Sequence, residues 1–96
     1  MPEYILLMHD DSNGGEADWE PYLRKLRESG VFEGGSAVGD GMCVRKSGAP
    51  AAPTRHLAGY IRVNATSLDH AKALLDGNPV FEAGGTVEIR ELPRTD

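Results

Sequence analysis

The fold is decided by residues 57–77, which read LAGYIRVNATSLDHAKALLDG. Branched and aromatic side chains in the first part predict a β-strand over residues 57–64. Thr66 or Ser67 then offers a side-chain oxygen to cap a helix, and Gly77 is typical of a helix end. Between these limits the apolar residues recur at helical spacing, at Leu68, Ala71, Leu74 and Leu75. The stretch therefore predicts a strand followed by a short amphipathic helix.

A similar strand and helix are expected nearer the N-terminus. Tyr4 to Met8 is a short apolar run, which predicts a central strand buried on both faces. A helix follows Asp18, its expected N-cap, and ends near Gly30. Pro21 is compatible with the first turn, where its missing N–H lacks an intrahelical partner in any case. The apolar stripe of this helix consists of Trp19, Tyr22, Leu23 and Leu26.

Three further strands complete the expected sheet. Residues 31–38 and 42–46 predict two strands joined at Asp40, because an Asp-Gly step favours a hairpin turn. Residues 47–56, rich in Ala and Pro, have the composition of an irregular loop. Residues 85–92 alternate in character and predict a last strand with an exposed face or edge. The expected order of elements is β-α-β-β-β-α-β.

An internal repeat supports a layout in two halves. The tripeptide Val-Phe-Glu at 31–33 recurs at 80–82, an offset of 49 residues that also relates Asp18 to Ser67, the two cap candidates. Paired strand–helix units of this kind are typical of a split β-α-β fold. A chain of 96 residues is sufficient for one domain. We therefore expect a single α+β, ferredoxin-like domain over 1–96, with an antiparallel sheet carrying two helices on one face.

Composition and charge exclude several functions. The formal net charge is −5 and no basic run exceeds the pair Arg45–Lys46, so nucleic-acid binding is not expected. No apolar run approaches the length of a membrane span. Residues 1–4 lack the basic region of a signal peptide, so we expect a cytoplasmic protein. The core of so short a chain is modest, which favours a homodimer that buries one face of the sheet.

Metal and disulfide chemistry are not expected. Cys43 is the single cysteine, which excludes an internal disulfide and a cysteine-rich zinc site. It lies in an apolar, strand-like stretch, where we expect it to be buried as a small hydrophobic residue. The histidines at positions 9, 56 and 70 lack the spacing of metal ligands. Neither a metal nor a cofactor is predicted.

Short motifs follow one another along the chain in an order that resembles a known family. They are the strand Tyr4–Met8, the helix residues Trp19, Tyr22, Leu26 and Gly30, the pair Gly34-Gly35, Cys43-Val44-Arg45, Gly59-Tyr60, Ser67-Leu68-Asp69 with Ala71, and the ending Gly85–Arg90. Their order and spacing resemble the YCII-related family, in particular the branch named after a DGPF motif. The resemblance implies a ferredoxin-like domain of the dimeric α/β barrel superfamily, which dimerises by stacking its sheets and includes both small ring-modifying enzymes and binding proteins.

Two departures from that family affect the expected activity. The DGPF segment is missing, and the Ala- and Pro-rich loop before Leu57 takes its place. In the YCII branch the first helix carries a histidine assigned to acid–base chemistry, and the matching position here is Trp19. Tryptophan cannot transfer a proton at neutral pH. The leading hypothesis is therefore a small-molecule-binding homodimer.

Catalysis remains the main alternative. His9 and Asp10 follow the first strand, and a histidine beside carboxylates can act as a general base. Asp10 is similar to an acidic residue that the family often has there. Adjacent strand residues point to opposite faces, so these two need not converge. This alternative is a cofactor-free enzyme that transfers a proton on a small ring or lactone substrate. A third hypothesis, based on the acidic surface, is a regulatory protein–protein module.

Five residues are candidates for contacting a ligand. Trp19 and Tyr22 would wall an apolar pocket between helix and sheet, although both are also core candidates. Arg45 and Tyr60, expected on strands, would supply polar contacts, although Arg45 is equally compatible with the surface. Asp40 is expected to approach the N-terminus of the first helix, although aspartate is common in turns.

Overall fold

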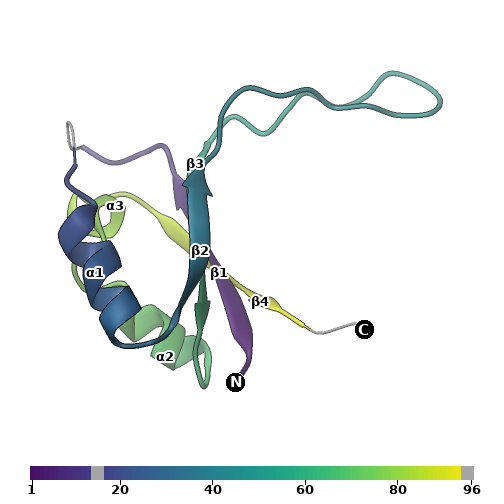
Figure 1. The fold of residues 1–96 in the computed structure, drawn as a ribbon. Coiled ribbons are helices and arrows are strands. Elements are labelled where there is room, and N and C mark those ends of the chain that lie inside the picture. Colours follow the sequence, from purple (N-terminus) through teal and green to yellow (C-terminus); the bar gives the residue numbers. More distant parts are fainter. Residues whose placement is uncertain (14–16, 94–96) are drawn as a thin grey trace.

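An antiparallel sheet covered by helices on one face is formed by residues 1–13 and 17–93, the part of the chain that this computed structural model describes (Figure 1). In that part, four strands and three helices follow in the order β1 Glu3–His9, α1 Glu20–Glu28, β2 Phe32–Ala37, β3 Leu57–Asn64, α2 Leu68–Ala73, α3 Pro79–Glu82 and β4 Val87–Leu92. The strand order in the sheet is β2-β3-β1-β4, and each neighbouring pair is antiparallel. This α+β arrangement is compatible with a ferredoxin-like fold.

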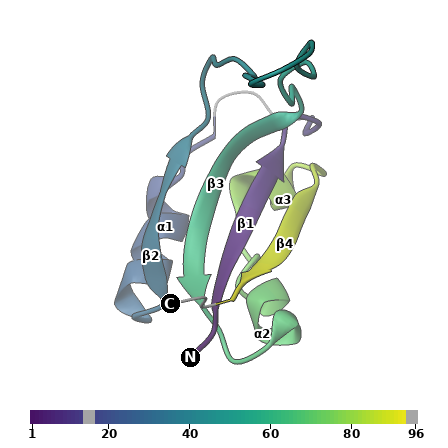
Figure 2. The ribbon, with the colours of Figure 1, turned by 90° about the vertical axis from the view of Figure 1, so that its right-hand side faces the viewer.

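The first strand lies in the centre of the sheet, as its apolar run predicts. β1 pairs with β3 on one side and with β4 on the other. Tyr4, Leu6 and Met8 are buried under the helices. Ile5 and Leu7 alternate with them, lie on the opposite face and are half-buried. The expectation of burial on both faces is wrong for the single chain, because no helix formed by residues 1–13 and 17–93 covers that second face (Figure 2).

Helix ends follow local sequence signals closely. Ser67 caps α2 by accepting a hydrogen bond from the backbone N–H of His70 at 3.1 Å. Gly30 and Gly77 adopt positive φ angles of 76° and 88° after the first two helices, as expected of helix stops. The N-cap of α1 is Trp19 rather than Asp18, whose carboxylate accepts the N–H of Glu20 at 3.1 Å.

The structural match expected from the two-half repeat is wrong at the third helix. Residues 80–82, expected to match the strand entry at 31–33, lie in α3. Asn78 caps this helix, because its Oδ1 accepts hydrogen bonds from the N–H groups of Val80 at 3.0 Å and Phe81 at 3.1 Å. Pro79 then occupies the first turn, where proline is favoured. The same tripeptide therefore leads into a strand in one place and lies within a helix in the other, because its neighbours differ.

The strand expected at 42–46 does not form. Residues 38–56, here called the arm, connect β2 to β3 and project from the end of the sheet (Figure 1). Cys43 is exposed, so the expectation that it is buried is wrong. A strand needs a neighbour for its backbone hydrogen bonds, and this segment extends beyond the sheet that would supply one.

No helix in the described part of the chain is long and apolar enough to cross a membrane. The longest, α1, has nine residues.

Candidate functional site

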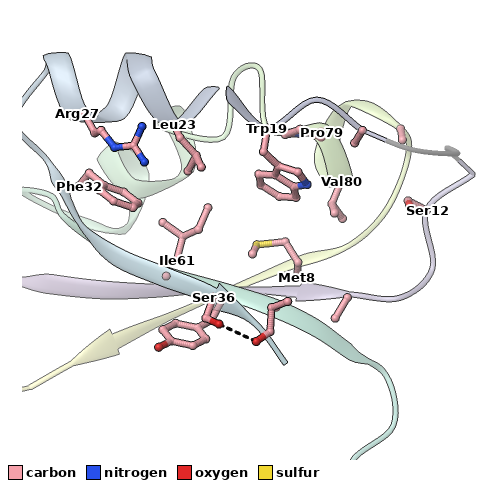
Figure 3. A pocket seen from close by; sticks show the side chains of 17 residues that line it. Met8, Ser12, Trp19, Leu23, Arg27, Phe32, Ser36, Ile61, Pro79 and Val80 are labelled. Carbon is pink, nitrogen blue, oxygen red and sulfur yellow. Dashed lines mark hydrogen bonds between the residues drawn. The ribbon is translucent and has the colours of Figure 1, made fainter. Parts of the chain in front are cut away.

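A cavity of about 510 Å³ lies between the covered face of the sheet and the helices α1 and α3 (Figure 3). Its volume is within the range of about 300–1,000 Å³ that is usual for small-molecule sites. Most of the lining is apolar and comes from elements far apart in the sequence. The main apolar side chains are Met8, Trp19, Leu23, Phe32, Ile61 and Val80.

Two glycines shape the sheet side of the cavity. A Cβ atom on Gly35 in β2 would lie 2.5 Å from the backbone oxygen of Tyr60. One on Gly59 in β3 would lie 3.0 Å from the backbone oxygen of Ser36 and 3.7 Å from the side chain of Met8. The absence of both side chains lets β2 and β3 approach closely and leaves space above them.

The cavity has a cationic end. The guanidinium of Arg27 lies 5.3 Å from the centre of the Phe32 ring, which it covers. Glu20 is its ion-pair partner, but the nearest N–O distance is 3.8 Å and both side chains are about half-exposed. An exposed pair of this length contributes little to stability. Arg27 can therefore exchange Glu20 for an anionic group of a ligand with a small loss.

The opposite end of the cavity is lined by Ser12, from the segment after β1, and by Pro79 and Val80 of α3. Between the two ends, Trp19 lies on the helix side and Met8 on the sheet side (Figure 3). The arrangement suits a molecule with an apolar body and one negatively charged end.

Trp19 and Tyr22 have different positions although both belong to the predicted aromatic stripe. Trp19 lines the cavity and is partly buried. The Tyr22 ring is buried in the core 6.2 Å from Trp19, centre to centre, in an edge-on arrangement. Its hydroxyl donates a 2.7 Å hydrogen bond to the backbone oxygen of Leu74. Burial raises the pKa of the Tyr22 phenol, an effect that the nearby amide of Asn78 partly offsets.

The side chains of the other three ligand candidates lie outside the cavity. Tyr60 is among the residues that line the cavity. It alternates along β3 with the buried Gly59 and Ile61, however, so its ring belongs to the uncovered face of the sheet. Asp40 and Arg45 lie in the arm. Asp40 lines a second, smaller hollow of about 380 Å³ at the base of the arm, and Arg45 donates a 3.2 Å hydrogen bond to the backbone oxygen of Ala49. The structure does not bring these three side chains to Trp19.

His9 faces Glu88 rather than Asp10. The Nε2 atom of His9 is 3.1 Å from a carboxylate oxygen of Glu88. The ring of His56 lies edge-on to it, with 4.7 Å between ring centres. Hydrogen bonding to His9, assisted by Arg90, lowers the pKa of Glu88. The cluster sits at the end of β1, with the side chain of Asp10 exposed beside it.

Asp11 has a structural partner. Its carboxylate accepts hydrogen bonds from the backbone N–H of Thr86 at 2.7 Å and from the Thr86 hydroxyl at 2.6 Å. These bonds lower the pKa of Asp11. They connect the segment after β1 to the turn before β4.

Some site residues were missed by the sequence analysis. Arg27 follows Trp19 and Leu23 at intervals of four residues, so helical spacing already places the three on one side of α1. Glu88 gave no such signal, because its contact with His9 depends on the pairing of β1 with β4.

No three His, Cys, Asp or Glu side chains of the described residues are grouped so as to hold a metal ion. Compared with models of protein families and with curated proteins, the sequence matches none of them.

Proposed function

We propose that this protein binds a small, mainly apolar anion, such as an aromatic carboxylate, in the cavity between α1 and the sheet. The observation that carries the proposal is an apolar cavity of about 510 Å³ with the Arg27 guanidinium at one end. A flat apolar body would lie between Trp19 and Met8, where burial of its surface is favourable. Its carboxylate would pair with Arg27, whose planar guanidinium can donate two parallel hydrogen bonds.

Trp19 also provides the test, because it is the single tryptophan of the chain. We would titrate the protein with a panel of aromatic and aliphatic carboxylates and follow tryptophan fluorescence, with calorimetry as a second readout. A ligand in the cavity should change the emission of Trp19 in a saturable way. Absence of saturable binding across the panel would contradict the proposal.

Arg27→Met should weaken binding of a carboxylate by about tenfold or more, because a charge-assisted hydrogen bond is lost. The primary amide of the same ligand should bind both proteins equally. Arg24→Met is a matched control: Arg24 is on the same helix and 3.8 Å from the same Glu20, but does not line the cavity. Equal effects of the two substitutions would exclude Arg27 as the anion contact.

We also propose a homodimer that packs through the uncovered face of the sheet, as expected for a YCII-related protein. Ile5 and Leu7 lie half-buried on this face. Around them are charges of both signs, including the pair of Arg62 Nε with Glu3 at 2.6 Å. A patch with an apolar centre and both charges can be complementary to itself across a twofold axis. Light scattering at micromolar concentration tests this: a dimer that Leu7→Glu dissociates supports the proposal, and a monomeric wild type contradicts it.

The His9–Glu88 pair favours a second candidate, a cofactor-free enzyme acting on a small ring or lactone. A carboxylate that orients a histidine is a common feature of general bases. The panel should therefore include lactones, assayed for turnover. His9→Gln should abolish any turnover found, and the same test applies to Asp10→Asn, with His70→Gln as a control away from the cluster. Unchanged rates in the first two variants would dismiss this candidate.

A further inference from the structure

The arm projects from the sheet on the side away from the helices. Figure 1 shows residues 38–56 extending from the ends of β2 and β3 opposite α1 and α2, and Figure 2, which looks onto the uncovered face, shows the same segment beyond the ends of these strands. Its base is anchored where Val38 donates a 3.0 Å hydrogen bond to the backbone oxygen of Ala58. Its outer part turns back at Gly48, whose φ angle is +81°, next to the hydrogen bond from Arg45 to Ala49.

The arm leaves apolar side chains in water. Met42 is 82% exposed and Val44 is 80% exposed, with the exposed Cys43 between them. Three consecutive exposed side chains of this kind give the projecting segment an unusual amount of apolar surface. Exposed apolar surface is typical of interaction sites, because a monomer gains nothing from leaving it uncovered.

The arm and the rest of the chain have opposite charges. The arm contains three of the ten Lys and Arg residues but one of the fifteen Asp and Glu residues, so with neutral histidines its net charge is +2 and that of the remainder is −7. Complementary potentials of this kind favour association and fix its orientation. The acidic remainder of another copy is therefore a suitable partner for a basic, apolar arm.

We propose that the arm clasps a second copy of this chain. When two copies face each other across a twofold axis through their uncovered faces, each arm overhangs the other copy and the two contacts are equivalent. Met42 and Val44 then lie against the second copy. Arg45 and Lys46 lie next to the acidic surface of that copy. This inference rests on the homodimer proposed above and adds that the arm, as well as the sheet face, holds the two copies together.

The first test measures the dimer dissociation constant by sedimentation. The double substitution Met42→Ser and Val44→Ser should raise it about tenfold to a hundredfold, from the apolar area lost at each side chain. Leu68→Ser is the matched control, since Leu68 is 56% exposed on α2, behind the sheet. It should leave the dissociation constant unchanged.

The outcomes separate the two proposals. A monomeric wild type overturns both the sheet-face dimer and the clasp. A wild-type dimer that Leu7→Glu dissociates but the arm substitutions leave intact overturns the clasp alone. Because Met42 and Val44 are exposed, thermal unfolding of the double variant under monomeric conditions should match that of the wild type.

The second test uses Cys43, the single cysteine, as a built-in attachment point. A maleimide–benzophenone reagent is coupled to Cys43, and ¹⁵N-labelled and unlabelled chains are mixed in equal amounts before illumination. Crosslinked peptides that join a labelled to an unlabelled chain are the expected result. Crosslinks confined to one chain would mean that the arm folds back on its own body, and would overturn the clasp, as would the absence of crosslinks.

Discussion

The two faces of the sheet are built from the same strands but have different physical character. On the covered face Leu6 and Val63 are completely buried among apolar neighbours. On the uncovered face Leu7 and Tyr60 are half-buried next to charged side chains such as Arg62, which pairs with Glu3. Neighbouring residues of a strand point to opposite faces, so a core residue and a surface residue can be adjacent in the sequence.

The polar side chains on the two sides of the sheet also differ in burial and in the partners they contact. Asn78 is the buried polar residue of the described chain, and its Oδ1 is used to cap α3. The uncovered side instead holds polar pairs that are partly open to solvent, the hydrogen-bonded His9 and Glu88 and the ion pair of Arg62 with Glu3. The first arrangement contributes to folding, whereas the second leaves charges available to a partner or a substrate.

The largest difference in stability between the two faces should be seen when the adjacent residues Leu6 and Leu7 are each replaced by alanine. Leu6→Ala removes a completely buried side chain and should lower the free energy of unfolding by about 2–5 kcal/mol, from lost burial and the cavity created. Leu7→Ala, on the uncovered face, should lower the free energy of unfolding by about 1 kcal/mol or less at concentrations where the chain is monomeric. Urea denaturation followed by circular dichroism measures both. Equal losses would remove the distinction between the faces.

A smaller effect is expected at the close approach of β2 to β3. Gly35→Ala places a Cβ atom 2.5 Å from a backbone oxygen, so the strands must shift, at a cost of about 1–3 kcal/mol. Gly39→Ala is the control, since among the described residues no atom beyond its chain neighbours lies within 4 Å of the added carbon. The same denaturation experiment compares the two. If Gly35→Ala is as mild as the control, the close contact does not limit the sheet.

The hydroxyl of the buried Tyr22 should contribute less to the free energy of unfolding than the close approach at Gly35. Tyr22→Phe removes the hydrogen bond to Leu74 and should lower the free energy of unfolding by about 1 kcal/mol. Tyr60→Phe, on the uncovered face, should have almost no effect. Spectroscopic titration gives a second readout: the tyrosine with the raised pKa should disappear in Tyr22→Phe and persist in Tyr60→Phe.

The smallest effect should be seen as a pH dependence at the turn joined by Asp11. Its pKa is lowered in the folded state by the hydrogen bonds from Thr86. The stabilisation is therefore present above the unfolded-state pKa of about 3.9 and is lost as the pH falls through the folded-state pKa. Asp11→Asn should be less stable than the wild type at neutral pH, and the two melting curves should converge on acidification. A difference that stays constant with pH would contradict this role, and Asp10→Asn serves as the exposed control.

Local signals predicted the secondary structure where hydrogen bonds form within a few residues. Ser67 and Gly77 limit their helix as the sequence indicates, and the apolar run of β1 occupies the centre of the sheet. The strand expected at 42–46 is wrong, because an apolar extended pattern becomes a strand when a neighbouring strand pairs with it. Residues 80–82 likewise took their conformation from the Asn-Pro start before them.

The candidate site depended on tertiary structure more than the fold did. Trp19 was found from helical spacing, but the cavity also needs Met8, Ile61 and Val80, which converge when the helices pack on the sheet. His9 and Glu88 are 79 residues apart and meet through the register of β1 with β4. The sequence by itself determined the Ser67 cap, the helix stops at Gly30 and Gly77 and the alternating patterns of the strands, since these depend on short-range hydrogen bonds and side-chain direction. The tertiary structure decided which faces are covered and which charges meet, because these depend on long-range strand pairing and packing.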